Sequence, residues 1–185
     1  MPKGFLKQRI LLNQLKAQDP QAFAEFYDQY VSRIYRFIFF KVSSVSDAQD
    51  LTSEVFLKTW QYLKESPQEE IKNLSAWVYR LARNTVIDWY RQQNKQPLSL
   101  ETQAEEAVLE TPGEKFNVDW EITQVQQALF RLKDEYREAL VLRFLDELEI
   151  SEVAKALEKS PGAIRVLLHR ALKALQVILT NQDER

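Results

Sequence analysis

The chain has 185 residues, and 25 Lys and Arg against 27 Asp and Glu give it a formal net charge of −2. It has no cysteine, which excludes disulfides, thiolate metal sites and cysteine nucleophiles. Few glycines and prolines, against many Ala, Leu, Gln, Glu, Lys and Arg, favour helices, and we expect an all-α protein. The start has no signal-peptide core and no stretch reaches the length of a membrane span, so we expect a cytoplasmic protein.

Three packed helices are predicted in the first 95 residues. The first covers residues 20–40, where a core-facing stripe is formed by Phe23, Phe26, Tyr30, Ile34, Phe37 and Ile38. The second is predicted to start at Ser46, which has capping-box spacing to Gln49, and its apolar positions are Leu51, Val55 and Tyr62. Residues 65–70 are polar and contain Pro67, which indicates a loop. Asn73 is the expected N-cap of the third helix.

The third helix combines a buried face with a basic and aromatic one. The buried face is expected to hold Leu74, Val78, Leu81, Ala82, Thr85 and Trp89, with Trp77 also in the core. The opposite face is expected to carry arginines without acidic partners, interleaved with rings: Tyr79, Arg80, Arg83, Asn84, Ile87, Tyr90 and Arg91. Guanidinium groups neutralise phosphates and rings stack on unpaired bases, which suits opened DNA. An ordinary solvated helix is the alternative, and this segment alone does not choose between them.

Residues 96–119 have the composition of an acidic linker. The segment contains six carboxylates and a single basic residue, Lys115. Pro97 and the pair Pro112-Gly113 interrupt any helical pattern. A helical pattern resumes near Trp120 and continues to residue 148. The linker therefore separates two helical domains.

The C-terminal part predicts a helix-turn-helix. A short helix begins near Ile150, and Ser160 as N-cap with Pro161 at the first helical position starts a longer one. The longer helix is expected to bury Ile164, Leu168, Ala171 and Leu175 and to expose Gly162, Arg165, Val166, His169, Arg170 and Lys173. In a major groove, Arg165 would reach base edges while Arg170 and Lys173 lie closer to phosphates. The alternative is an amphipathic hairpin with solvated charges. The single histidine, His169, excludes a histidine-rich metal site.

Taken in order, these segments resemble a bacterial RNA polymerase sigma factor of the sigma-70 superfamily, of the extracytoplasmic-function (group 4) type. "DPQAFAEFYDQY" (19–30) resembles the start of the family's first domain, and "DAQDLTSEVFLKTWQYL" (47–63) its polymerase-docking segment. "LSAWVYRLARNTVIDWYRQ" (74–92) resembles the part that melts and reads the −10 promoter element. "LKDEYREALVLRFLDELEISEVAKALEKSPGAIRVLLHRALKAL" (132–175) resembles the domain that reads the −35 element.

The resemblance implies a protein that directs core RNA polymerase to promoters and is not an enzyme. It implies a region 2-like domain at 1–95, the linker at 96–119 and a region 4-like domain at 120–185. The expected partners are core polymerase, through its β′ clamp and β flap, and promoter DNA; an anti-sigma factor is common in the family, and no residue here identifies one. No cofactor, metal site or catalytic residue is expected. The rival functions are a stand-alone helix-turn-helix regulator acting as a homodimer, and a helical interaction protein with no role on DNA.

By position, the resemblance assigns three sets of site residues. Core-polymerase binding falls on Asp50, Leu51, Glu54, Val55 and Phe56. Contact with −10 DNA falls on Asn73, Arg80, Arg83, Asn84, Asp88 and Arg91. Contact with −35 DNA falls on Ser160, Gly162, Arg165, Val166, His169 and Arg170. The sequence departs from the family pattern at Glu149, where Ser or Thr is common, at Glu158, where Gly is usual, and at Leu167, where a basic residue is frequent.

Overall fold

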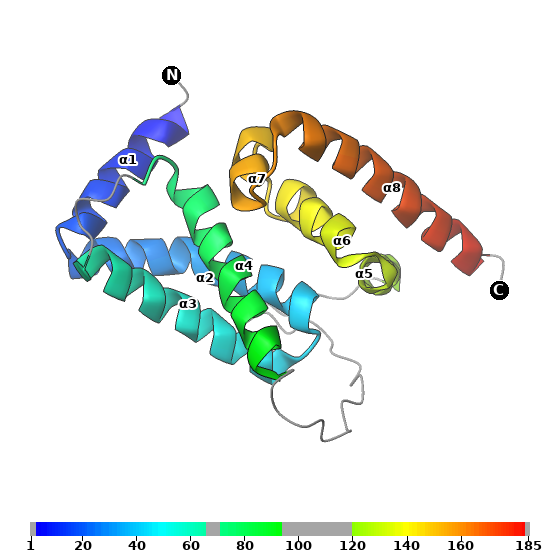
Figure 1. Ribbon diagram of the computed structural model, residues 1–185, viewed down its shortest axis with the longest axis horizontal. Coiled ribbons are helices and arrows are strands. Elements are labelled where there is room, and N and C mark those ends of the chain that lie inside the picture. The colour runs from blue at the N-terminus through cyan, green and yellow to red at the C-terminus, as the bar shows by residue number, and fades with distance from the viewer. Residues whose placement is uncertain (1–2, 66–70, 94–119, 184–185) are drawn as a thin grey trace. The chain divides into compact units, whose positions relative to one another are not determined.

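The protein consists of two compact helical units, residues 1–105 and 106–185, in a computed structural model that describes residues 3–65, 71–93 and 120–183 (Figure 1). The described residues form helices and no strands, so the predicted all-α class is confirmed. The boundary between the units falls within the predicted linker, which lies outside the described residues, as does most of the predicted loop at 65–70. No described helix combines the length and apolar character that a membrane span requires.

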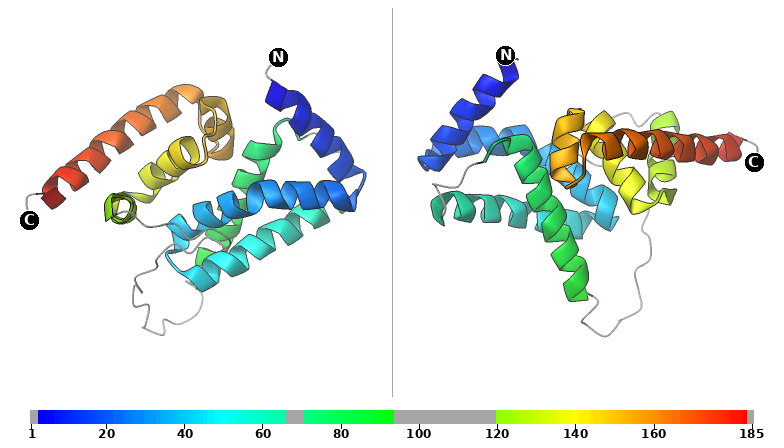
Figure 2. Two further views of the ribbon diagram at one scale, coloured as in Figure 1. Left: turned by 180° about the vertical axis from the view of Figure 1, so that it is seen from behind. Right: turned by 45° about the horizontal axis from the view of Figure 1, so that its top comes forward.

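The first unit contains α1 (Lys3–Lys16), α2 (Pro20–Val42), α3 (Val45–Glu65) and α4 (Leu74–Gln93). Helices α2 and α3 lie side by side, and α4 packs against both (Figures 1 and 2). The sequence prediction missed α1, which buries Leu11, Leu12 and Leu15 against this bundle. Its apolar stripe is too short to stand out among the polar residues around it.

The core of the first unit follows the predicted stripe of α2. Phe26, Tyr30, Ile34, Phe37 and Ile38 are all buried, as predicted, whereas Phe23 is only half-buried and its ring meets Trp60 edge-on at 5.0 Å. Tyr35 is buried as well, and this burial raises the pKa of its hydroxyl.

The helix starts of the first unit show which capping predictions were right. The Asn73 side-chain oxygen accepts a hydrogen bond from the Ala76 N–H at 2.7 Å, which confirms Asn73 as the N-cap of α4. The predicted cap at Ser46 is wrong. Ser44 caps α3 instead, since its hydroxyl accepts from the Asp47 N–H at 3.3 Å and Ser46 already lies inside the helix. Ser44 lies two residues before Ser46, and the sequence interpretation selected Ser46 because of its capping-box spacing to Gln49.

The second unit contains α5 (Trp120–Arg131), α6 (Asp134–Leu140), a π-helical turn η1 (Val141–Leu145), α7 (Ile150–Ala156) and α8 (Pro161–Asp183). The helical pattern predicted without interruption from residue 120 to 148 is therefore broken, first after Arg131 and again at η1.

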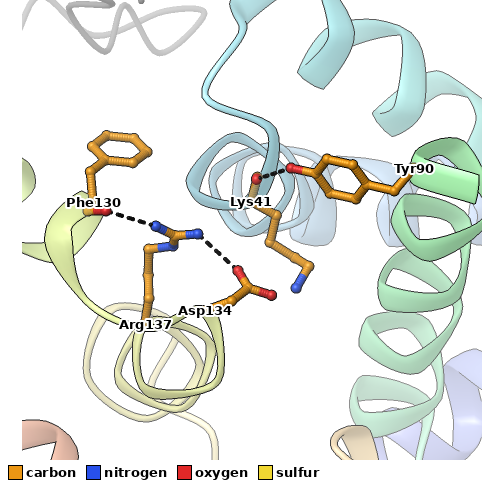
Figure 3. A network of polar contacts seen from close by, with 5 residues as sticks. All are labelled: Lys41, Tyr90, Phe130, Asp134 and Arg137. Atoms are coloured by element: carbon orange, nitrogen blue, oxygen red, sulfur yellow. Dashed lines mark hydrogen bonds and ion pairs between the residues drawn. The ribbon is translucent and has the colours of Figure 1, made fainter. Parts of the chain in front are cut away.

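The first break is held by Arg137. Its guanidinium group donates to the Phe130 carbonyl oxygen at 3.1 Å, at the end of α5, and pairs with the Asp134 carboxylate at 2.8 Å (Figure 3). The same group lies 5.7 Å from the centre of the Phe130 ring. One largely buried side chain thus satisfies a helix-end carbonyl and stabilises the corner between α5 and α6.

The second break is a wide turn. The Asp146 N–H donates to the Val141 carbonyl oxygen at 3.0 Å, five residues back, which defines the π-type turn. The Arg143 guanidinium group then donates to the Leu148 carbonyl oxygen at 2.8 Å, and Leu148 itself is buried. This turn redirects the chain into α7, the first helix of the helix-turn-helix.

Candidate functional sites

The start of α8 is built as the sequence predicts. The Ser160 hydroxyl accepts a hydrogen bond from the Ala163 N–H at 3.1 Å, and Pro161 occupies the first helical position. Ile164, Leu168 and Ala171 are buried, as predicted, whereas Leu175 is only half-buried. Leu167 is buried with them. A basic residue is frequent at this position in the family, whereas here the leucine side chain packs into the core of the unit.

The other side of α8 is a cationic surface, which we call the α8 face. All of its predicted members are exposed: Ser160, Gly162, Arg165, Val166, His169, Arg170 and Lys173. Within the described part of the chain, Arg165, Arg170 and Lys173 have no carboxylate partner. Arg165 lies in the first turns of this long helix, where a major-groove helix would meet base edges, and Arg170 and Lys173 lie further along it.

The turn that presents α8 departs from the family pattern in a way the structure explains. Glu158 has a φ of 55°, the left-handed region that glycine adopts at least cost. The Lys159 N–H donates to the Ala154 carbonyl oxygen at 2.9 Å, and the Lys159 ammonium pairs with the Glu135 carboxylate of α6 at 2.7 Å. These contacts hold the turn although Glu158 stands where glycine is usual.

The other departure, Glu149, is compensated within α7. The Glu149 backbone N–H donates to the Glu152 carboxylate at 3.0 Å, which is one half of a capping box. The start of α7 is thus capped by Glu152, without the hydroxyl side chain that the family pattern places at the helix start.

On α4, the predicted DNA-binding residues are distributed over exposed and half-buried positions. Arg80, Asn84, Asp88 and Arg91 are exposed, whereas Asn73 and Arg83 are half-buried. The prediction that the arginines lack acidic partners is wrong for Arg91, which pairs with Asp88 at 3.3 Å, one helical turn away. Both side chains of this pair are largely exposed, so the ion pair is weak and an external anion can compete with Asp88 for Arg91.

Among the aromatic residues of α4, the structure separates what the sequence had grouped. Tyr79 is fully buried, with its ring edge-on to Phe37 at 5.5 Å, so its predicted place on the basic face is wrong. A helical wheel does not show how far neighbouring helices wrap around a face, and here α2 covers Tyr79. Trp77 and Trp89 were expected in the core, and both are half-buried, against the rings of Tyr62 at 4.9 Å and Tyr90 at 4.8 Å.

Helix α3 divides its predicted polymerase-binding residues between core and surface. Leu51, Val55 and Phe56 are buried, and Asp50 and Glu54 are exposed. Glu54 pairs with Lys58 at 2.7 Å. Beside them Leu57, which the sequence reasoning did not select, leaves 62% of its surface exposed. The sequence could have predicted this exposure, because residue 57 does not lie on the helix face that carries the apolar residues 51 and 55.

Comparison with known proteins assigns both units to one family. Residues 26–96 match Sigma-70 region 2, and residues 122–175 match Sigma-70, region 4. The chain is 30% identical over 183 residues to the ECF RNA polymerase sigma factor SigW of Bacillus subtilis, covering 92% of this chain and 95% of SigW. It is also 30% identical over 179 residues to the ECF RNA polymerase sigma factor BldN of Streptomyces coelicolor, covering 91% of this chain and 64% of BldN.

Two solved structures share the fold at lower sequence identity. One is CnrH in complex with the cytosolic domain of CnrY, with a TM-score of 0.68 at 20% identity, covering 94% of this chain and 97% of CnrH. The other is the sigma factor RpoE from Bartonella quintana in complex with the anti-sigma factor NepR, with a TM-score of 0.67 at 21% identity, covering 85% and 96%. The matches to both sigma-70 regions and to SigW show that this chain belongs to the sigma-70 family, as an RNA polymerase sigma factor of the extracytoplasmic-function type.

Proposed function

We propose that this sigma factor binds core RNA polymerase through α3, holds opened −10 DNA with α4 and reads the −35 element with α8. The observation that carries the proposal is the α8 face, where exposed arginines without carboxylate partners in the described chain lie opposite a buried apolar stripe. It acts in the cytoplasm as an initiation factor without enzymatic chemistry of its own, since the polymerase supplies the reaction.

Readout of the −35 element rests on the N-terminal turns of α8. Arg165 is the candidate for a base contact, because an arginine fork matches the two acceptors that guanine presents in the major groove. Arg170 and Lys173 lie further along the helix and are candidates for phosphate contacts, which supply affinity without sequence information. The Lys159–Glu135 ion pair of 2.7 Å supports the angle at which the turn delivers α8.

Contact with −10 DNA rests on the exposed part of α4. Arg80, Arg83 and Asn84 lie within about one helical turn of each other and provide positive charge and an amide for the backbone and bases of an unpaired strand. Arg91 joins them when a phosphate replaces Asp88 as its partner, a replacement favoured by the exposure of both side chains.

Docking on polymerase rests on the exposed side of α3. Asp50 and Glu54 supply negative charge for a basic partner surface such as the β′ clamp. The exposed Leu57 supplies an apolar contact to the same partner surface. The buried Leu51, Val55 and Phe56 fix the orientation of this helix in the bundle. The second unit is the candidate for contact with the β flap.

An anti-sigma protein is a further candidate partner. CnrH and RpoE were each solved in complex with another protein, the cytosolic domain of CnrY and the anti-sigma factor NepR. Because this chain belongs to the same family, we propose that an anti-sigma protein binds it as well. No residue of the described chain identifies that partner.

The test combines the purified chain, core RNA polymerase and a randomised promoter library. Selection from the library should recover a common −10 and −35 pair, and transcription from it should require both proteins. A stand-alone helix-turn-helix regulator would instead bind duplex DNA tightly without polymerase. Selective binding by the chain alone, with no transcription when polymerase is added, would overturn the proposal.

A further inference from the structure

The C-terminal turns of α4 extend beyond the core of the first unit. Val86 is the last buried residue of this helix, and each residue from Ile87 to Gln93 is half-buried or exposed. These turns carry Arg91, which the proposed function assigns to −10 DNA, and its ion-pair partner Asp88. Segments with few buried contacts open and move more easily than the core, so the position of these turns depends on the contacts that remain.

Tyr90 provides one such contact, to the end of α2. Its hydroxyl donates a hydrogen bond of 2.6 Å to the Lys41 carbonyl oxygen (Figure 3). The last carbonyl groups of a helix have no partner within the helix. At the end of α2, the Phe39 carbonyl oxygen accepts from the Ser43 N–H at 2.9 Å, and the Lys41 carbonyl oxygen accepts from Tyr90. A side chain of α4 thus caps the C-terminus of α2.

The ring of Tyr90 is held by the same contacts. Its hydroxyl end is bound to Lys41, and its ring lies edge-on to Trp89 with 4.8 Å between centroids. Although 42% of the residue is exposed, turning the ring to stack on a DNA base would cost the hydrogen bond to Lys41. The geometry therefore argues against the base-stacking role that an exposed tyrosine on a DNA-facing helix suggests.

We infer that Tyr90 is a positioning residue: its hydroxyl fastens the C-terminal turns of α4 to α2 and so holds Arg91 where it meets −10 DNA. The inference rests on the proposed function. In this role the hydroxyl of Tyr90 supports DNA binding, whereas in a stacking role the ring would do so. The two roles are separated by Tyr90→Phe, which keeps the ring and removes the donor.

The chain offers a matched control in Tyr27. This tyrosine is 43% exposed, and its ring lies 4.8 Å from that of Phe56. Among the described residues its hydroxyl has no hydrogen-bond partner. Tyr27→Phe therefore removes the hydroxyl of an equally exposed tyrosine in the same unit without removing a hydrogen bond between helices.

The experiment compares holoenzymes containing the wild-type chain, Tyr90→Phe, Tyr90→Ala and Tyr27→Phe. The affinity for a fluorescent single-stranded −10 oligonucleotide is measured beside the affinity for core polymerase. Tyr90→Phe should weaken oligonucleotide binding roughly two- to ten-fold, the range of a single lost hydrogen bond, with Tyr90→Ala at least as weak. Tyr27→Phe should match wild type, and all four chains should bind core polymerase equally. Hydrogen exchange of the backbone amides of residues 87–93 should be faster in Tyr90→Phe than in wild type, and unchanged in Tyr27→Phe.

Each other result counts against the inference. Wild-type binding by Tyr90→Phe with a loss in Tyr90→Ala would identify the ring as a stacking platform. A parallel loss of affinity for core polymerase would indicate general damage to the unit and would also overturn a positioning role. Failure of the wild-type holoenzyme to bind any −10 oligonucleotide would instead refute the proposed function, and the inference with it.

Discussion

Replacing Arg165 by alanine tests the reading of the −35 element. Arg165 is exposed and has no carboxylate partner among the described residues, so its truncation should leave the free energy of unfolding unchanged. The whole effect should then appear in DNA binding. A base contact of this kind is worth about 1–3 kcal/mol, which corresponds to roughly 5- to 150-fold weaker binding of the matched −35 sequence.

The assay is a fluorescence titration of holoenzyme on promoters with the selected and a scrambled −35 element, at several salt concentrations. Arg165→Ala should reduce the preference for the selected element and leave binding to the scrambled one nearly unchanged. Lys173→Ala is the matched comparison, because a lost phosphate contact weakens binding on both sequences and lowers the salt slope by about 1. If Arg165→Ala behaves like Lys173→Ala, then Arg165 contacts phosphate and the assignment of base readout to it is refuted.

Three further substitutions test the turn, the corner and the opening surface. Glu158→Gly should raise the free energy of unfolding by about 0.5–1 kcal/mol, since relief of the left-handed φ exceeds the entropy cost of glycine; a urea melt no better than that of Glu158→Ala would contradict this. Arg137→Lys keeps the charge but not the fork that reaches both Phe130 and Asp134, and it should lower the same free energy by about 1–2 kcal/mol in thermal or urea unfolding. An unchanged melt would mean that the corner is held by packing. Arg83→Ala should reduce permanganate reactivity of −10 thymines on a duplex promoter more than it reduces closed-complex binding, and an equal loss of both would contradict a role in opening.

Local patterns in the sequence determined much of this protein. The buried stripes of α2 and α8 follow from apolar spacing alone, because a helix that must bury one face needs apolar residues at that period. The caps at Asn73 and Ser160 follow from side chains that satisfy the first N–H groups of a helix. These are interactions between residues a few positions apart, so the order of amino acids is sufficient to predict them.

Tertiary structure decided what distant segments do to one another. Tyr79 and Tyr90 look alike on a helical wheel, yet α2 buries one and binds the hydroxyl of the other. The corner at Arg137 and the turn at η1 interrupt a continuous helical pattern. At the corner, the Arg137 side chain donates to the Phe130 carbonyl oxygen, and at η1 the Asp146 N–H donates to the carbonyl oxygen five residues back instead of four. Amphipathic spacing states which face of a helix is apolar. Which neighbour covers that face, how far it reaches and where a hydroxyl finds its acceptor depend on the packing of whole helices.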